Sequence, residues 1–131
     1  MNHQQTLFDL FDTGRGYLDN QQHDFSKLTW HHNPNAEGVS LKHMVTADQT
    51  KGQFSYHLVN IEAGRKIPKH QHDVQLETHE VIAGSGICYC DDQARSYTLG
   101  TISILPAGKA HEVIAGDSGL CLFAKFMPAL C

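Results

Sequence analysis

Three histidines and two glutamates fall within twelve residues of the chain, in the stretch KHQHDVQLETHE at residues 69–80. In an extended strand, residues i and i+2 face the same way, so His70 and His72 can both reach one metal ion without strain. A metal ion needs further ligands, and these must come from neighbouring strands. The spacing therefore indicates one part of a metal site.

Two carboxylates follow the histidine pair, and at most one of them can join it. Glu77 and Glu80 are three residues apart, so a regular strand directs them to opposite faces. The face of Glu77 continues through His79, whereas the face of Glu80 includes Thr78. Both faces are mixed in polarity, and alternation alone does not decide between the two glutamates.

The segments that must position these residues are short and alternate between apolar and polar residues with a period of two. Turn residues separate them, and this pattern is typical of an all-β sandwich or barrel of antiparallel strands. No helix of ordinary length competes with it, although residues 9–18 have room for a turn or two. The expected strands are residues 39–45, 52–61, 77–83, 87–90, 96–99, 101–105, 111–115 and 121–126.

The first part of the chain differs from the rest. Residues 1–25 are polar and rich in Gln, Asn and Asp, apart from the apolar stretch LFDLF at residues 7–11. We expect residues 1–25 to form an N-terminal arm that packs on the domain or on a dimer mate, and residues 26–131 to form the barrel domain. A homodimer is the expected oligomeric state.

Composition narrows the function classes. The chain has 131 residues, which suits a single domain, and a net charge of −4 with thinly spread Lys and Arg. It therefore offers no basic patch for nucleic acid and no membrane anchor. No apolar run is long enough for a membrane span and the start of the chain does not resemble a signal peptide, so a cytoplasmic location and a small-molecule partner are expected.

The four cysteines, at positions 88, 90, 121 and 131, lack the paired spacing of a zinc ribbon or of a thioredoxin-type redox motif. Cys88 and Cys90 lie two residues apart in an expected strand and therefore share a face. We expect both to be small apolar core residues with free thiols.

Two motifs of this chain resemble those of the cupin family. The first is Gly64-x5-His70-x-His72-x4-Glu77-x6-Gly84, and the second is Gly100-x5-Pro106-x-Gly108-x2-His111. The family expects an asparagine three residues further on, where this chain has Ala115, but that asparagine is not a ligand. The motifs span residues 64–115, and the strand pattern extends the resemblance from about residue 38 to 127.

The resemblance implies a single antiparallel jelly-roll barrel with a metal held by His70, His72, Glu77 and His111. It thus favours Glu77 over Glu80, which becomes the outward residue. Three imidazoles and one carboxylate leave two positions open on an octahedral ion. The donors suit one divalent transition metal, Fe, Mn, Ni, Co, Zn or Cu, and the sequence does not choose among these.

Two further histidines have functional and structural interpretations. His79 shares the face of Glu77, where it is either an acid/base near the metal or a buried histidine bonded to a neighbour. His57 alternates with Tyr56, so one of the two faces inward, in a structural or a substrate-binding role.

The expected function is that of a metal-dependent enzyme acting on a small organic metabolite. Dioxygenase chemistry is favoured, because two adjacent open positions can hold substrate and oxygen together, and isomerase or lyase chemistry is the next choice. The alternative is a non-catalytic barrel that binds or senses a small ligand and in which the metal is structural.

Overall fold

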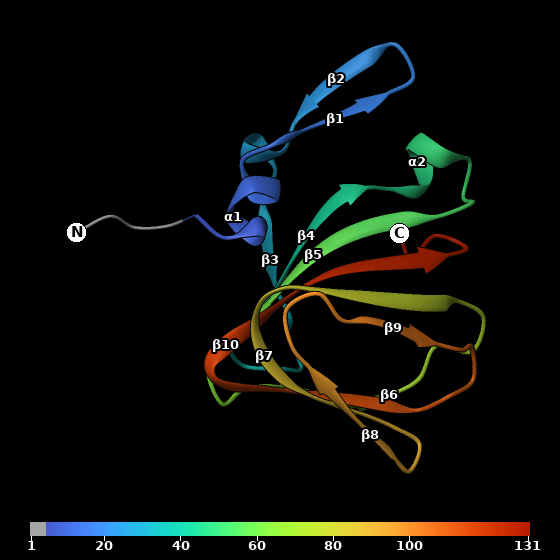
Figure 1. Ribbon diagram of the computed structural model, residues 1–131. Coiled ribbons are helices and arrows are strands. Elements are labelled where there is room, and N and C mark those ends of the chain that lie inside the picture. The colour runs from blue at the N-terminus through green and yellow to red at the C-terminus, as the bar shows by residue number, and fades with distance from the viewer. Residues whose placement is uncertain (1–4) are drawn as a thin grey trace.

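An antiparallel sheet of eight strands closes into a barrel in the computed structural model, which describes residues 5–131 (Figure 1). The order is β3-β4-β5-β10-β7-β8, with β6 paired to β10 and β9 paired to β7. This confirms the expected all-β class. The strands are β3 (Trp30–His32), β4 (Val39–Val45), β5 (Ser55–Ile61), β6 (Lys66–His70), β7 (Leu76–Cys90), β8 (Gln93–Tyr97), β9 (Ile102–Leu105) and β10 (His111–Met127).

Two of these strands are longer than the sequence pattern predicted. The expected separate strands 77–83 and 87–90 form the single strand β7, and 111–115 and 121–126 both belong to β10. The prediction of breaks was wrong because the glycines between the segments mark bends within continuous strands, not turns. The β7–β10 register shifts between Ala115 and Leu120, where both strands bend together.

Glycine is required at the bend because the two backbones approach closely there. Gly84 has a φ of +73°, and a Cβ at this position would collide with the carbonyl oxygen of Gly119. Gly119 has a φ of +80°. Positive φ values are strained for other residues, so the glycine pair permits both the backbone conformation and the close contact.

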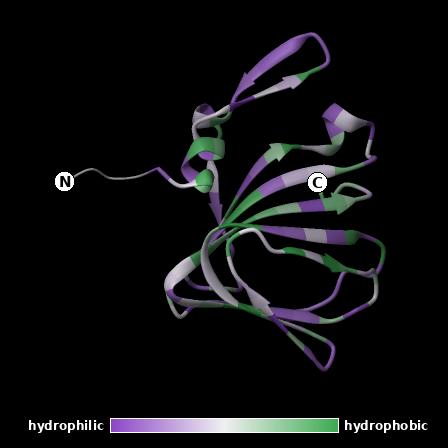
Figure 2. Ribbon diagram, in the orientation of Figure 1, coloured by the Kyte–Doolittle hydropathy of each residue, from purple (hydrophilic) through white to green (hydrophobic). Residues whose placement is uncertain are grey.

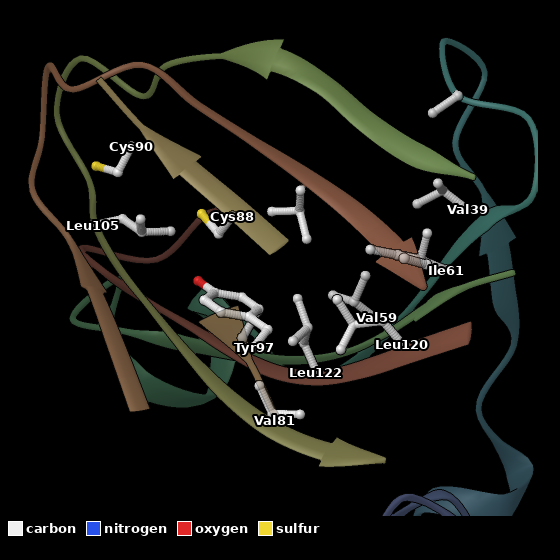
Figure 3. Close-up of a cluster of buried hydrophobic side chains, with 14 of the residues drawn as sticks. Val39, Val59, Ile61, Val81, Cys88, Cys90, Tyr97, Leu105, Leu120 and Leu122 are labelled. Atoms are coloured by element: carbon white, nitrogen blue, oxygen red, sulfur yellow. The ribbon is translucent and has the colours of Figure 1, made fainter. Parts of the chain in front are cut away.

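The interior of the barrel holds the main hydrophobic core, part of which is shown in Figure 3. Alternate residues of each strand point inward, so that Val59 and Ile61 of β5 meet Leu120 and Leu122 of β10. Cys88 and Cys90 lie in this core with free thiols, as expected from their spacing. Figure 2 shows the matching alternation of hydrophobic and hydrophilic residues along the strands.

A second hydrophobic cluster fills the space between the N-terminal segment and the outer face of the sheet. Leu58 of β5 and Phe123 of β10 point outward into it, where Phe8 and Phe11 pack against their surroundings. Both faces of β5 are therefore buried around Leu58. The segment comprises α1 (Leu7–Asp12), β1 (Arg15–Leu18), β2 (Gln21–Asp24) and the 3-10 helix η1 (Phe25–Lys27), and a further short helix, α2 (Ala47–Thr50), follows β4.

The expected N-terminal arm thus contains ordered structure and packs on its own domain. Helix α1 has six residues and is capped by Thr6, which accepts a hydrogen bond from the Asp9 amide. Lys42 of β4 is 2% exposed and donates hydrogen bonds to the Asp12 carboxylate and the Phe25 carbonyl, so it ties the segment to the barrel. Residues 1–4 of the expected arm lie outside the described part of the chain.

Within residues 5–131, none of the helices has the length and apolar character needed to cross a membrane.

The bend predicts a difference between two Gly→Ala variants. Gly84→Ala should lower the free energy of unfolding by roughly 2–5 kcal/mol, because it combines a strained φ with a collision. Gly64→Ala is the matched control, since Gly64 has a φ of +72° with nothing within 4 Å of the place where a Cβ would lie, and it should cost only about 1 kcal/mol. Urea unfolding measures both, and equal losses would contradict the role of the close approach.

Candidate metal centre

Three strands bring the four expected ligands together at one end of the barrel. His70 ends β6, His72 follows it, Glu77 lies at the start of β7, and His111 begins β10. Each offers one ligand atom, and these atoms all lie within 4.8 Å of one another. The structure therefore assembles all four residues in one cluster, which we call the His/Glu cluster.

The bend of β7 and β10 brings Glu77 and His111 of this cluster together. In the ladder between the two strands, Glu77 pairs with Phe126 near one end and His111 pairs with Cys90 at the other. Despite this separation along the ladder, Nε2 of His111 lies 3.1 Å from Oε1 of Glu77. Curvature of the paired strands closes the barrel and thereby brings the two ends of the ladder together.

Two buried atoms of the cluster have no hydrogen-bond partner among the described residues. They are Oε1 of Glu77 and Nε2 of His111, and Nε2 of His72 is 3.5 Å from the same oxygen. Leaving buried polar atoms unpaired is costly. A cation bound between them would satisfy both, so the residues present fit a metal ion.

Two of the imidazoles are hydrogen-bonded to backbone carbonyls through Nδ1. Nδ1 of His70 donates to the Pro68 carbonyl at 2.9 Å, and Nδ1 of His111 donates to the Lys109 carbonyl at 3.4 Å. Because a carbonyl can only accept, each ring donates from Nδ1, which leaves Nε2 to face the cluster. Outer contacts of this kind commonly orient the imidazoles that bind a metal through Nε2.

His79 lies behind Glu77 and uses both of its ring nitrogens. Nε2 is 2.7 Å from Oε2 of Glu77, and Nδ1 is 2.9 Å from the hydroxyl of Tyr97. A carboxylate accepts, so Nε2 donates to Glu77 and Nδ1 accepts from Tyr97. This geometry matches the interpretation of a buried histidine bonded to its neighbours, while an acid/base role for His79 stays a prediction.

The two glutamates do point to opposite faces. Glu77 is buried in the cluster, whereas Oε1 of Glu80 pairs with Nζ of Lys125 on the outer face of the sheet. The geometry thus places Glu77, and not Glu80, beside the histidines.

The charge state of the cluster follows from burial and from its neighbours. Burial would raise the pKa of Glu77, but the neighbouring His79 and His111 outweigh this effect and lower it, so the carboxylate stays ionised. Burial lowers the pKa of His72, against the attraction of Glu77. A carboxylate oxygen beside imidazole nitrogens is a donor set that suits a divalent cation.

A cavity of about 420 Å³ opens onto the cluster. Its wall is mainly apolar, and its polar residues outside the cluster are few. This volume is of the size that accommodates small organic ligands. The lining comprises Asn33, Asn35, Leu41, Val59, Ile67, Pro68, Lys69, Val113, Ala124, Phe126 and Leu130 together with His79 and the four cluster residues.

His57, and not Tyr56, faces inward. Its side chain is buried, with Nε2 2.8 Å from the Ser55 hydroxyl and Nδ1 2.7 Å from Nδ1 of His43. Tyr56 packs outward against Phe123. The sequence did not reveal that His43 is the partner of His57, because their pairing depends on the register between β4 and β5.

Solved structures of low sequence identity share this architecture. A predicted oxalate decarboxylase from Thermotoga maritima matches with a TM-score of 0.72 and 16% identity, over 79% of this chain and 95% of that one. An RmlC-like cupin from Shewanella frigidimarina has a TM-score of 0.69 and 15% identity, over 80% and 87% of the two chains. Ectoine synthase from P. lautus has a TM-score of 0.64 and 19% identity, over 72% and 67%.

These similarities establish the class, a small protein with the cupin jelly-roll fold. Comparison with curated proteins found no match. The model of the AraC-like ligand binding domain matches residues 55–126, which is more than half of the chain. The chain belongs to this family, and the matched region contains all four residues of the His/Glu cluster.

The metal centre makes a prediction that separates the two glutamates. Glu77→Gln should weaken Mn²⁺ binding at least about tenfold, because the variant loses the only anionic ligand of the cluster while keeping its shape. Glu80→Gln is the matched control on the opposite face and should bind Mn²⁺ as the parent protein does. Titration followed by electron paramagnetic resonance measures both, and equal affinities of the two variants would contradict the assignment.

The buried His57 predicts a pH dependence of stability. Burial and the neighbouring His43 lower its pKa from 6.5 to about 4, against the attraction of Glu77. A lowered pKa means that the unfolded chain binds the proton first, so the stabilisation is complete above about pH 6.5 and is lost as the pH falls towards about 4. The loss is on the order of 2–3 kcal/mol.

The stability difference between the parent protein and His57→Gln should therefore shrink across this range of pH. Urea unfolding in the presence of a chelator, at several pH values from neutral to mildly acidic, measures it. A difference that stays constant with pH would show that His57 does not titrate in this way.

Proposed function

We propose that this protein is a metal-dependent enzyme acting on a small organic molecule. The observation that carries the proposal is a pair of buried atoms, Oε1 of Glu77 and Nε2 of His111, that have no hydrogen-bond partner within residues 5–131 and lie beside a cavity large enough for a metabolite. Charged or polar groups left unpaired in a binding cavity are typical of a site completed by its ligand.

His70, His72, Glu77 and His111 would hold one divalent transition metal, which is Fe, Mn, Ni, Co, Zn or Cu. When bound, the ion supplies a positive charge that polarises an oxygen atom of the substrate and, if it is redox-active, a path for electrons. Four protein ligands would leave an octahedral ion two positions for exchangeable ligands, and the cavity opens onto the cluster.

The other residues of the chain position and shield this site. His79 donates to Oε2 of Glu77 and leaves Oε1 directed at the histidines, so we propose that it orients the ligating carboxylate. Phe126 lies 5.2 Å from the ring of His72, and with Val113 it gives the cavity an apolar wall. Such a wall excludes water and strengthens electrostatic interactions at the metal.

Among reaction types, this arrangement supports dioxygenase chemistry over isomerase or lyase chemistry. The latter two need a side chain that exchanges a proton with the substrate. His79 is buried behind Glu77, and outside it and the four cluster residues the titratable residue of the described lining is Lys69, which is exposed. A dioxygenase needs only adjacent open positions for oxygen and substrate.

A non-catalytic barrel that binds or senses a small ligand is the second candidate. It is supported by membership of the AraC-like ligand binding domain family. In this case the metal stabilises the cluster, and the cavity binds its ligand without changing it.

We propose, further, that the protein forms a homodimer and acts in the cytoplasm. The observation relevant to the dimer is that Leu7 and Leu10 of α1 are 48% and 53% exposed. Sedimentation of the purified protein tests the dimer.

Oxygen consumption and ligand binding, measured together, test the catalytic proposal. The Fe(II)-loaded protein is screened under air against catechols, thiols, diketones and keto acids, with Glu77→Gln as the inactive control. We expect oxygen uptake with one class of compound, and none with the variant. Binding of a compound by calorimetry without turnover in any metal form would favour the ligand-binding module, and uptake that survives in Glu77→Gln would contradict the assigned centre.

A further inference from the structure

A second group of metal-ligating side chains lies outside the His/Glu cluster. It consists of His43 in β4, His57 in β5 and Cys131 after β10, and we call it the His/Cys cluster. Their ligand atoms lie within 4.8 Å of one another. His43 and His57 sit opposite each other in the ladder between β4 and β5, so strand pairing holds the two imidazoles together.

Cys131 is held beside the two histidines by backbone contacts. The Ala47 amide donates to the Cys131 carbonyl at 2.7 Å, and the Leu130 amide donates to the Ser55 hydroxyl at 2.8 Å. These contacts attach residues 130–131 to α2 and β5. The backbone that carries the thiol is therefore held by two hydrogen bonds.

The separation of the thiol and one imidazole nitrogen matches that of a tetrahedral site. Sγ of Cys131 lies 3.7 Å from Nδ1 of His43. Zinc bond lengths and tetrahedral angles place a sulfur and a nitrogen ligand about 3.6 Å apart and two nitrogen ligands about 3.3 Å apart. The two Nδ1 atoms are 2.7 Å apart, so binding would require the rings to separate by roughly half an ångström.

The imidazole of His57 is hydrogen-bonded through the nitrogen that faces away from the cluster, as metal-binding histidines commonly are. Nε2 of His57 lies 2.8 Å from the Ser55 hydroxyl, which leaves Nδ1 as the nitrogen that faces the cluster. The ring of His31 stacks on that of His43, with 5.0 Å between the centroids. These contacts orient both imidazoles.

We propose that His43, His57 and Cys131 form a second metal site, which takes a thiophilic cation of the zinc class. Two imidazole nitrogens and one thiolate suit a tetrahedral ion, with the fourth position filled by water. The donor set differs from that of the His/Glu cluster, which has a carboxylate and no sulfur. The two sites should therefore prefer different ions.

The second site is separate from the cavity's metal centre but touches the same wall. Phe126 lies between them, with its ring 5.5 Å from that of His57 and 5.2 Å from that of His72. Leu130, next to Cys131, lines the cavity. A cation bound to Cys131 would thus fix the segment that forms one side of the cavity, in addition to any ion in the His/Glu cluster.

Titration with Co²⁺ tests this proposal, because cobalt bound to a thiolate shows a sulfur-to-metal charge-transfer band in the near ultraviolet that nitrogen and oxygen ligands cannot produce. We expect this band in the parent protein, its loss in Cys131→Ser, and its displacement by Zn²⁺. Cys121→Ser is the matched control, since Cys121 is a half-buried free thiol beside Asn60, outside the cluster. It should keep the band.

The Glu77→Gln variant allows the second metal site to be tested independently of the His/Glu cluster. The variant should keep the charge-transfer band whether or not Mn²⁺ binding is lost. His43→Ala should lose the band while circular dichroism shows a folded β-protein. Absence of the band in the parent protein, or its persistence in Cys131→Ser, would overturn the second site.

Discussion

The joint bend of β7 and β10 is the constraint on which the candidate metal centre depends. The two strands pair along most of their lengths, from the Met127–Leu76 end to the His111–Cys90 end. A straight ladder would hold Glu77 and His111 far apart, since a strand rises about 3.3 Å for each residue. Because the ladder bends where Gly84 meets Gly119, its two ends face each other across the barrel and the ligands meet.

The barrel also has to accommodate polar groups in an apolar interior. Glu77, His79 and Tyr97 are buried and form a chain of hydrogen bonds that leads from the core to the cluster. Each link is satisfied up to Oε1 of Glu77, where the chain ends without a partner among the described residues. A network that is complete except at the atom facing the other ligands is consistent with an interior arranged around a bound cation.

The outer face of the sheet is covered by the N-terminal segment, which supports the strands from outside the barrel. The N-terminal segment covers Leu58 and Phe123 from outside, while the buried Lys42 links it to β4 through Asp12. An uncompensated buried ammonium group would be costly, so the ion pair fixes where the segment lies. The strands that bear His43 and His57 are thereby packed on both faces, and their inward side chains gain a rigid support.

The sequence by itself determined the all-β class and the inward and outward alternation, and the resemblance of two motifs named the four residues that the structure then brings together. Alternation depends only on the two-residue period of a strand, so it separated Glu77 from Glu80 without choosing between them, and the resemblance of two motifs supplied the choice. Local periodicity also identified Cys88 and Cys90 as core residues. The acid/base role of His79 and the metal itself remain predictions.

Only the tertiary structure decided which distant residues meet. It showed that Gly84 marks a bend and not a turn, that His79 lies between Glu77 and Tyr97, and that His43, His57 and Cys131 converge. The physical reason is that these contacts depend on strand register and on the close approach of backbones far apart in the chain. Residue types and local spacing describe one strand at a time and contain no information about its partner.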